Sequence, residues 1–242
     1  MQQKANKLFR EQISGWPLLG ANWKKLDSAL MKSFDFEGFT IRVQFNPKRI
    51  ISSAAKVDRV SIEERLCFLC VANRPPEEES LAFGSDYEIL CNPFPIFKKH
   101  YTIAKVDHIP QVIDPEFPRM LDLSRELPEL VLFYNAPGCG ASAPDHMHFQ
   151  AGNQGFMPIE DEVEGLMERY GKNLSSDEEC KVMAVNDGLR SFLVLESENK
   201  GALETAFLHI SSFMRQHINE DEPMLNILAY FRDQWQILVF PR

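Results

Sequence analysis

The pattern of hydrophobic and polar positions changes period several times along this chain of 242 residues. In residues 1–40 the apolar positions are spaced for one buried helical face, with glycine and proline interruptions in "GWPLLGANW", and they predict helices. From Phe39 to Phe45 apolar and other residues alternate, which predicts a strand that stops at Asn-Pro. Residues 87–106 predict two strands around a turn marked by prolines.

The remainder of the chain mixes both periods. A helix-like stretch with Pro118 near its start is interrupted by Pro128, and an apolar run follows it. Two hairpins with an amphipathic helix between them are expected further on, at 181–197, 200–218 and 224–242. Helices mixed with hairpin-connected strands predict an α+β fold built on an antiparallel sheet with flanking helices.

The stretch "PDHMHFQAG" carries the first chemical signal. His146, His148 and Gln150 alternate, so on a strand they would share one face while Met147 and Phe149 point into the core. Such groups are buried together only where each finds a hydrogen-bond partner, so a polar sheet edge is the structural alternative, although it is a better explanation of one histidine than of all three residues. The chemical interpretations are a metal site, or a neutral imidazole that attacks phosphorus.

The run "NAPGCGASA" directly before these residues helps to choose between the two. Its glycines, including Gly140, and its small side chains, including Ser142, let backbone N–H groups approach an anion closely. A phosphate-binding loop that leads into a histidine strand favours attack at phosphorus.

The combined stretch "NAPGCGASAPDHMHFQAG" resembles the active-site segment of the histidine triad superfamily, in the branch whose last histidine is a glutamine. That branch holds galactose-1-phosphate uridylyltransferases, diadenosine tetraphosphate phosphorylases and GDP-hexose phosphorylases. The resemblance runs from about residue 39 to 157, and a weaker one covers 182–242. It implies a histidine-triad-like sheet, either as one unit or as two fused halves, a catalytic half at 39–160 and a degenerate half at 161–242. The helical spacing described above predicts a separate N-terminal helical segment at 1–38. Because the chain stops directly after an apolar strand, we expect either a short form or missing C-terminal sequence.

The resemblance also implies roles. His148 would be the nucleophile that takes a nucleoside monophosphate, and Gln150 would hydrogen-bond the phosphoryl oxygen. His146 is a further residue of this catalytic strand. Asn135, Gly140 and Ser142 would shape the phosphate loop, although a gap-free register places Ala143 rather than Ser142 at the serine position of the uridylyltransferases.

The pair Cys67 and Cys70 in "CFLC" is by itself weak evidence for a metal, since two small apolar core residues would look the same. In the uridylyltransferases two such cysteines and two downstream histidines hold a structural metal. The resemblance therefore implies a structural zinc on Cys67, Cys70, His108 and His146, with His100 competing with His108. No organic cofactor is expected.

Charge and composition limit the partners. The net charge of −9 argues against a sequence-blind nucleic-acid binder, and the chain has no long apolar run and no hydrophobic signal core. Five cysteines without a secretion signal indicate reduced thiols in a cytoplasm. Arg49, Lys56 and Arg74 are the candidate phosphate-binding cations, although each could be an ordinary surface charge.

The leading hypothesis is a nucleotidyltransferase or phosphorylase that works through a nucleotidylated His148. Its substrate would be a nucleoside diphosphate sugar, favoured by "HFQA", or a dinucleoside polyphosphate, favoured by "NRPPEE", with phosphate or a sugar phosphate as acceptor. A nucleotide hydrolase of the same fold, a catalytically silent nucleotide-binding scaffold and a metal-dependent hydrolase remain alternatives. A monomer or a homodimer is expected.

Overall fold

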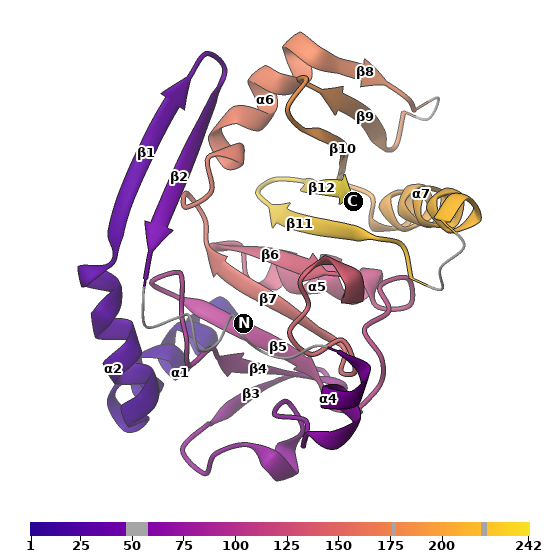
Figure 1. The fold of residues 1–242 in the computed structure, drawn as a ribbon. Helices are drawn as coiled ribbons and strands as arrows, with labels where there is room; N and C mark the ends of the chain where they lie inside the picture. Colours follow the sequence, from indigo (N-terminus) through magenta and orange to yellow (C-terminus); the bar gives the residue numbers. More distant parts are fainter. Residues whose placement is uncertain (47–57, 176–177, 219–221) are drawn as a thin grey trace. The chain divides into compact units, whose positions relative to one another are not determined.

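The computed structural model describes residues 1–46, 58–175, 178–218 and 222–242 (Figure 1). It divides into two compact units, the first made of Met1–Gln111 and Ala141–Pro158, the second of Val112–Gly140 and Ile159–Arg242. Both combine helices with antiparallel strands, as the α+β prediction requires. Residues 1–38 belong to the first unit, and residues 112–140 belong to the second. The predicted division into an N-terminal segment and two homologous halves, with boundaries at 38 and 160, stays a prediction. Within the described ranges no helix is long and apolar enough to span a membrane.

The first unit begins with two helices, α1 (Gln2–Gly15) and α2 (Pro17–Lys25), joined at the buried Trp16. A two-stranded hairpin of β1 (Leu30–Phe36) and β2 (Phe39–Phe45) follows. The strand predicted at Phe39–Phe45 is confirmed, but the helical prediction is wrong for β1. The turn between the strands favours the hairpin over a helix. Gly38 has a φ of 89°, a conformation that suits a two-residue hairpin turn and that residues other than glycine rarely adopt.

The main sheet of the first unit has the antiparallel order β3-β4-β5-β7. Its strands are β3 (Ser80–Phe83), β4 (Tyr87–Cys91), β5 (His100–Lys105) and β7 (His148–Asn153). The buried side chains of Tyr87, Ile89, Ile103 and Phe149 form much of its core. Helix α1 packs on β3 and β4, and its Ala5 carbonyl accepts a hydrogen bond from the Tyr101 hydroxyl at 3.1 Å.

Two short helical segments flank the region that the cysteines occupy. They are α4 (Arg59–Glu64), whose first turn is capped by the Asp58 side chain at the Ser61 N–H, and the 3-10 helix η3 (Val71–Asn73). The loop between them carries Cys67 and Cys70.

The second unit has the antiparallel strand order β6-β11-β12-β10-β9-β8. These strands are β6 (Leu130–Asn135), β8 (Gly171–Asn173), β9 (Lys181–Asn186), β10 (Ser191–Ser197), β11 (Leu225–Phe231) and β12 (Trp235–Pro241). Its helices are α5 (Phe117–Glu126), α6 (Ile159–Tyr170) and α7 (Lys200–Ile218), and Phe117 and Phe207 stack between α5 and α7 with ring centroids 3.9 Å apart. Both C-terminal hairpins and the helix between them are confirmed.

Candidate functional site

His148 opens strand β7, and a buried glutamine holds its main chain in place. The Nε2 of Gln111 donates to the His148 carbonyl at 2.9 Å, and the His148 N–H donates to Gln111 Oε1 at 2.8 Å. Both residues are buried. Across the strand pair His148 lies opposite Ala104 of β5. The amide of Gln111 therefore replaces the strand neighbour that this stretch of backbone would otherwise need.

The ring of His148 is fixed in one tautomer. Its Nδ1 lies 2.8 Å from the carbonyl of His146, and since a carbonyl only accepts, Nδ1 carries the proton and Nε2 carries a lone pair. Burial lowers the pKa of His148 to about 4, against the smaller opposing effect of that carbonyl. A neutral imidazole with a lone pair on Nε2 is the form that can act as a nucleophile or as a metal ligand.

Gln150 follows on the same face of β7 as His148, and its carboxamide is oriented by a second histidine. His100 is fully buried; the Ile96 N–H donates to its Nδ1 at 3.4 Å, so its proton lies on Nε2. That Nε2 donates to Gln150 Oε1 at 3.0 Å. The Oε1 atom of Gln150 therefore accepts the hydrogen bond from His100, and its NH₂ group faces away from His100.

His146 does not lie on the strand. A turn closed by a 3.1 Å hydrogen bond from the His146 N–H to the Ala143 carbonyl precedes β7, which begins at His148. The prediction that His146, His148 and Gln150 share one strand face is therefore wrong for His146, because the turn directs its ring elsewhere. His148 and Gln150 keep the predicted relation.

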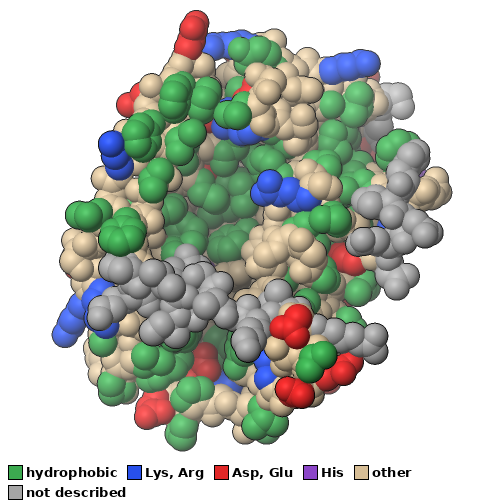
Figure 2. All heavy atoms as spheres, viewed as in Figure 1, with side chains coloured by type: hydrophobic (Ala, Val, Ile, Leu, Met, Phe, Trp, Pro, Cys, Tyr) green, Lys and Arg blue, Asp and Glu red, His purple; other side chains and the backbone are tan. Residues whose placement is uncertain are grey.

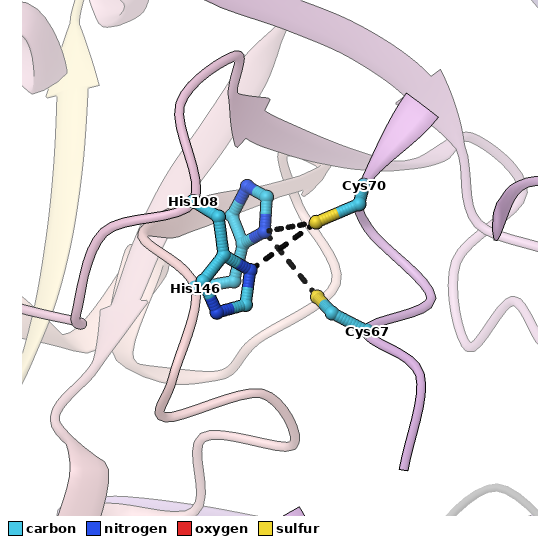
Figure 3. A group of neighbouring side chains, drawn as sticks. All are labelled: Cys67, Cys70, His108 and His146. Atoms are coloured by element: carbon cyan, nitrogen blue, oxygen red, sulfur yellow. Dashed lines mark hydrogen bonds between the residues drawn. The ribbon is translucent and has the colours of Figure 1, made fainter. Parts of the chain in front are cut away.

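The ring of His146 joins Cys67, Cys70 and His108, whose ligand atoms all lie within 4.8 Å of one another (Figure 3). Nδ1 of His146 is 3.3 Å from Cys67 Sγ and 3.6 Å from Cys70 Sγ, and Nδ1 of His108 is 3.2 Å from Cys70 Sγ. A tetrahedral zinc ion with ordinary bond lengths would hold sulfur and nitrogen ligands about 3.5 Å apart. The four residues therefore fit a zinc ion, and the expected set could hold a metal.

Both histidine rings of this cluster are supported from behind. The Nε2 of His146 donates to the Lys105 carbonyl at 2.7 Å, which leaves its Nδ1 lone pair for a metal. The Nε2 of His108 lies 3.8 Å from Asp145 Oδ2, and Asp145 is in turn paired with Arg65. Outer partners of this kind fix the orientation of metal-binding imidazoles.

The surroundings of Cys67 favour the thiolate form of its side chain. Burial would raise its pKa, but the contact with His146 and hydrogen bonds from the N–H groups of Leu69 and Cys70 outweigh burial and lower the pKa to about 6. The pKa of His146 is raised, since the contact with Cys67 and the Lys105 carbonyl outweigh burial. The thiolate is the form of cysteine that binds metal ions.

Arg74 lies in the same region, but its guanidinium makes contacts within the protein. Nε and Nη2 donate to the Leu69 carbonyl at 2.8 and 2.6 Å, and Nη1 donates to Glu88 Oε2 of β4 at 2.6 Å. The neighbouring Asn73 donates to the Cys67 carbonyl at 2.9 Å. These contacts hold the loop that carries both cysteines, whereas the phosphate-binding role of Arg74 stays a prediction.

The remaining predicted phosphate-binding residues fall in different parts of the chain. Ser142 belongs to the first unit with His148, while Asn135 and Gly140 belong to the second. Gly140, with a φ of 97°, closes the 3-10 turn η4 (Pro137–Cys139) in a conformation that favours glycine. Arg49 and Lys56 lie outside the described residues.

Three residues whose roles the sequence did not reveal hold candidate residues in place, each within its own unit. Gln111 follows His108 in "DHIPQ", and His100 was considered only as a metal ligand. Asn226 of β11 donates to Asn135 Oδ1 at 2.7 Å and to the Cys139 carbonyl at 2.9 Å. Each acts through contacts 37 to 91 residues apart in sequence, so no local signal could have revealed them.

Comparison of structures gives the class of fold. Yeast Ap4A phosphorylase Apa2 in complex with AMP matches with a TM-score of 0.57 and 19% identity, over 97% of this chain and 80% of that chain. The same enzyme in complex with Ap4A matches with a TM-score of 0.57 and 15% identity, over 91% and 78%. A DUF4931 family protein from Bacillus cereus matches with a TM-score of 0.49 and 18% identity, over 68% and 85%. The chain has an Ap4A phosphorylase-like α+β fold, which confirms the predicted fold class.

Comparison of sequences then gives the family. The sequence model of the family described as "Domain of unknown function (DUF4922)" matches residues 8–153, and the chain belongs to this family. None of the curated proteins matches the chain.

Proposed function

We propose that this protein transfers a nucleoside monophosphate from a dinucleoside polyphosphate to an acceptor phosphate, by way of a nucleotidylated His148. The observation that carries the proposal is the hydrogen bond from His148 Nδ1 to the His146 carbonyl. It directs the lone pair of the neutral ring to Nε2, the atom that would attack. The proposal assigns the chain to the glutamine-containing branch of the superfamily, which the stretch around His148 resembles.

The reaction proceeds in two displacements. The His148 Nε2 lone pair forms a bond to the α-phosphorus while the bond from that phosphorus to the bridging oxygen breaks, and the leaving phosphate chain departs with the bonding electrons. An oxygen of inorganic phosphate then attacks the same phosphorus, the phosphorus–nitrogen bond breaks, and the neutral imidazole is restored. From Ap4A this yields ATP in the first step and ADP in the second.

Gln150 stabilises the charge that develops on the phosphoryl oxygens. Its amide NH₂ is the available donor, because its Oε1 accepts the hydrogen bond from His100. A carboxamide neither gains nor loses a proton near neutral pH, so it cannot activate water as a general base. This favours phosphate or a sugar phosphate over water as the acceptor. Asn135, Gly140, Ser142, Arg49, Lys56 and Arg74 stay our candidates for binding the phosphate chain.

A dinucleoside polyphosphate is favoured as substrate because the fold matches an Ap4A phosphorylase over most of both chains. A nucleoside diphosphate sugar is the second candidate, and the same attack on its α-phosphorus would release a sugar phosphate. A zinc ion on Cys67, Cys70, His108 and His146 would cross-link the turn before β7 to the cysteine loop. Such a cross-link would hold in place the His146 carbonyl, which lies 2.8 Å from His148 Nδ1.

Product analysis tests the proposal. The protein is incubated with Ap4A, with GDP-, UDP- and ADP-sugars, and with and without inorganic phosphate. We expect ADP and ATP from Ap4A only when phosphate is present, and no turnover by His148→Ala. Formation of AMP and ATP without phosphate would identify a hydrolase. Tight binding without turnover of any donor would identify a silent scaffold.

A further inference from the structure

The hairpin of β1 and β2 separates apolar and polar side chains onto opposite faces. Residues that pair across antiparallel strands point to the same side, and the register joins Leu30 to Phe45 and Phe36 to Phe39. One face is apolar apart from a single lysine: Leu30, Lys32, Phe34, Phe36, Phe39, Ile41, Val43 and Phe45. The other face carries Met31, Ser33, Asp35, Thr40, Arg42 and Gln44. We call the first set the apolar face of the hairpin.

The polar face is the one that contacts the rest of the first unit. Arg42 Nη1 donates to the Phe156 carbonyl at 2.9 Å, and Gln44 Nε2 donates to the Ile96 carbonyl at 3.3 Å. The apolar face lies on the opposite side of the ribbon, and six of its side chains, from Leu30 to Phe45, are 39% to 68% exposed. Hydrophobic side chains reach the surface where β1 and β2 lie (Figure 2).

This pattern is the reverse of what a lone hairpin needs. A two-stranded ribbon is marginally stable by itself in water and is normally stabilised by packing its apolar face. Six half-exposed side chains of this size present about 600 Å² of apolar surface, which is at the upper limit for the largest patch on an ordinary monomer. Patches of that size mark sites of association.

We propose that the apolar face of the β1–β2 hairpin is a homodimer interface, on which a second copy of this chain packs its own apolar face. A two-fold interface requires a surface that is complementary to itself, and a flat apolar ribbon meets that requirement by stacking as two sheets do. Two such faces would bury about 1,200 Å², the lower limit for a specific stable interface. A strand of seven residues spans about 23 Å, which is longer than a nucleobase or other small ligand would cover.

Sedimentation equilibrium of the full chain tests this proposal between about 1 and 100 µM, a range in which interfaces of this size associate. We expect a mass of twice 27.8 kDa for the wild type. Ile41→Glu combined with Val43→Glu places charges on the apolar face and should weaken the dimer by about 100-fold. Ser33→Glu, which adds one such charge on the polar face, should leave the dimer unchanged.

Hydrogen exchange of the wild type at the two ends of this concentration range needs no variant. It therefore tests the proposal even if the double variant does not fold. We expect the amides of β1 and β2 to become more protected at the higher concentration, while those of β3 and β4 do not change. A monomer at the higher concentration, or a dimer whose hairpin amides show no change, would overturn the proposal. Protection that instead follows added nucleotide would also overturn it and would assign the face to the substrate.

Discussion

The imidazole of His148 is defined by contacts that leave one reactive atom. The Gln111 amide fixes its backbone, the His146 carbonyl takes its Nδ1 proton, and burial keeps it neutral, with a pKa of about 4. Gln150 is fixed in a comparable way, since His100 binds one end of its amide. At this scale the site is a pair of pre-oriented groups, a lone pair on His148 and an NH₂ donor on Gln150, and pre-orientation is what makes such donors effective in a transition state.

Replacing His100 tests whether it positions Gln150. His100→Leu removes the donor to Gln150 Oε1, so the amide can rotate and its NH₂ donor is misplaced. We expect kcat to fall by about 10-fold with KM little changed, because the interaction strengthens only in the transition state. His100→Gln, which keeps a donor, should retain most of the activity. In His100→Leu/Gln150→Ala the two losses should not add, and full additivity would show that His100 acts independently of Gln150.

The loop between α4 and η3 carries two of the four candidate metal ligands, Cys67 and Cys70. The Cys70 N–H donates to the Cys67 carbonyl at 3.3 Å, Asn73 donates to the same carbonyl, and Arg74 ties the Leu69 carbonyl to Glu88 of β4. Three backbone contacts therefore shape the loop before any metal binds. The cysteine loop is thereby attached to the sheet that also contains β7.

Arg74→Gln tests this role of the loop. The variant loses the ion pair with Glu88 and the paired donation to Leu69, so the cysteines are less well held and zinc affinity should fall by about 10- to 100-fold, as for other outer partners of metal ligands. Competition against a chromogenic chelator measures that affinity directly. Arg10→Gln, a change on the exposed side of α1, is the matched control and should not alter the affinity. Equal zinc affinity in the wild type and Arg74→Gln would contradict the assigned role.

Over the whole molecule, local patterns predicted the elements better than the contacts between them. The alternation from Phe39 to Phe45 and the turn sequence between β9 and β10 are encoded by neighbouring residues, and both elements were found as expected. Strand β1 was missed because its alternation competes with a helical spacing in residues 1–40. The segment forms a strand because it pairs with β2 across the turn at Gly38.

The candidate site was predictable to the same extent. The alternating histidines and the CxxC spacing could be recognised in the sequence, and His108 rather than His100 joins the cysteines as expected from the resemblance. The turn that separates His146 from His148 and the clamp by Gln111 could not be recognised. Both depend on contacts between segments that only the folded chain brings together, such as Cys67 with His146, 79 residues apart.

The central claim is that His148 becomes covalently nucleotidylated, and intact-protein mass spectrometry after a short incubation with Ap4A and the nucleotide sugars tests it most directly. The reaction is stopped in alkali, because a phosphorus–nitrogen bond to histidine is acid-labile. We expect a mass increase of one nucleoside monophosphate in the wild type and in the control His209→Ala, whose ring is exposed on α7. We expect no increase in His148→Ala. An adduct of the same size in His148→Ala, or turnover by a wild type that forms none, would contradict the account.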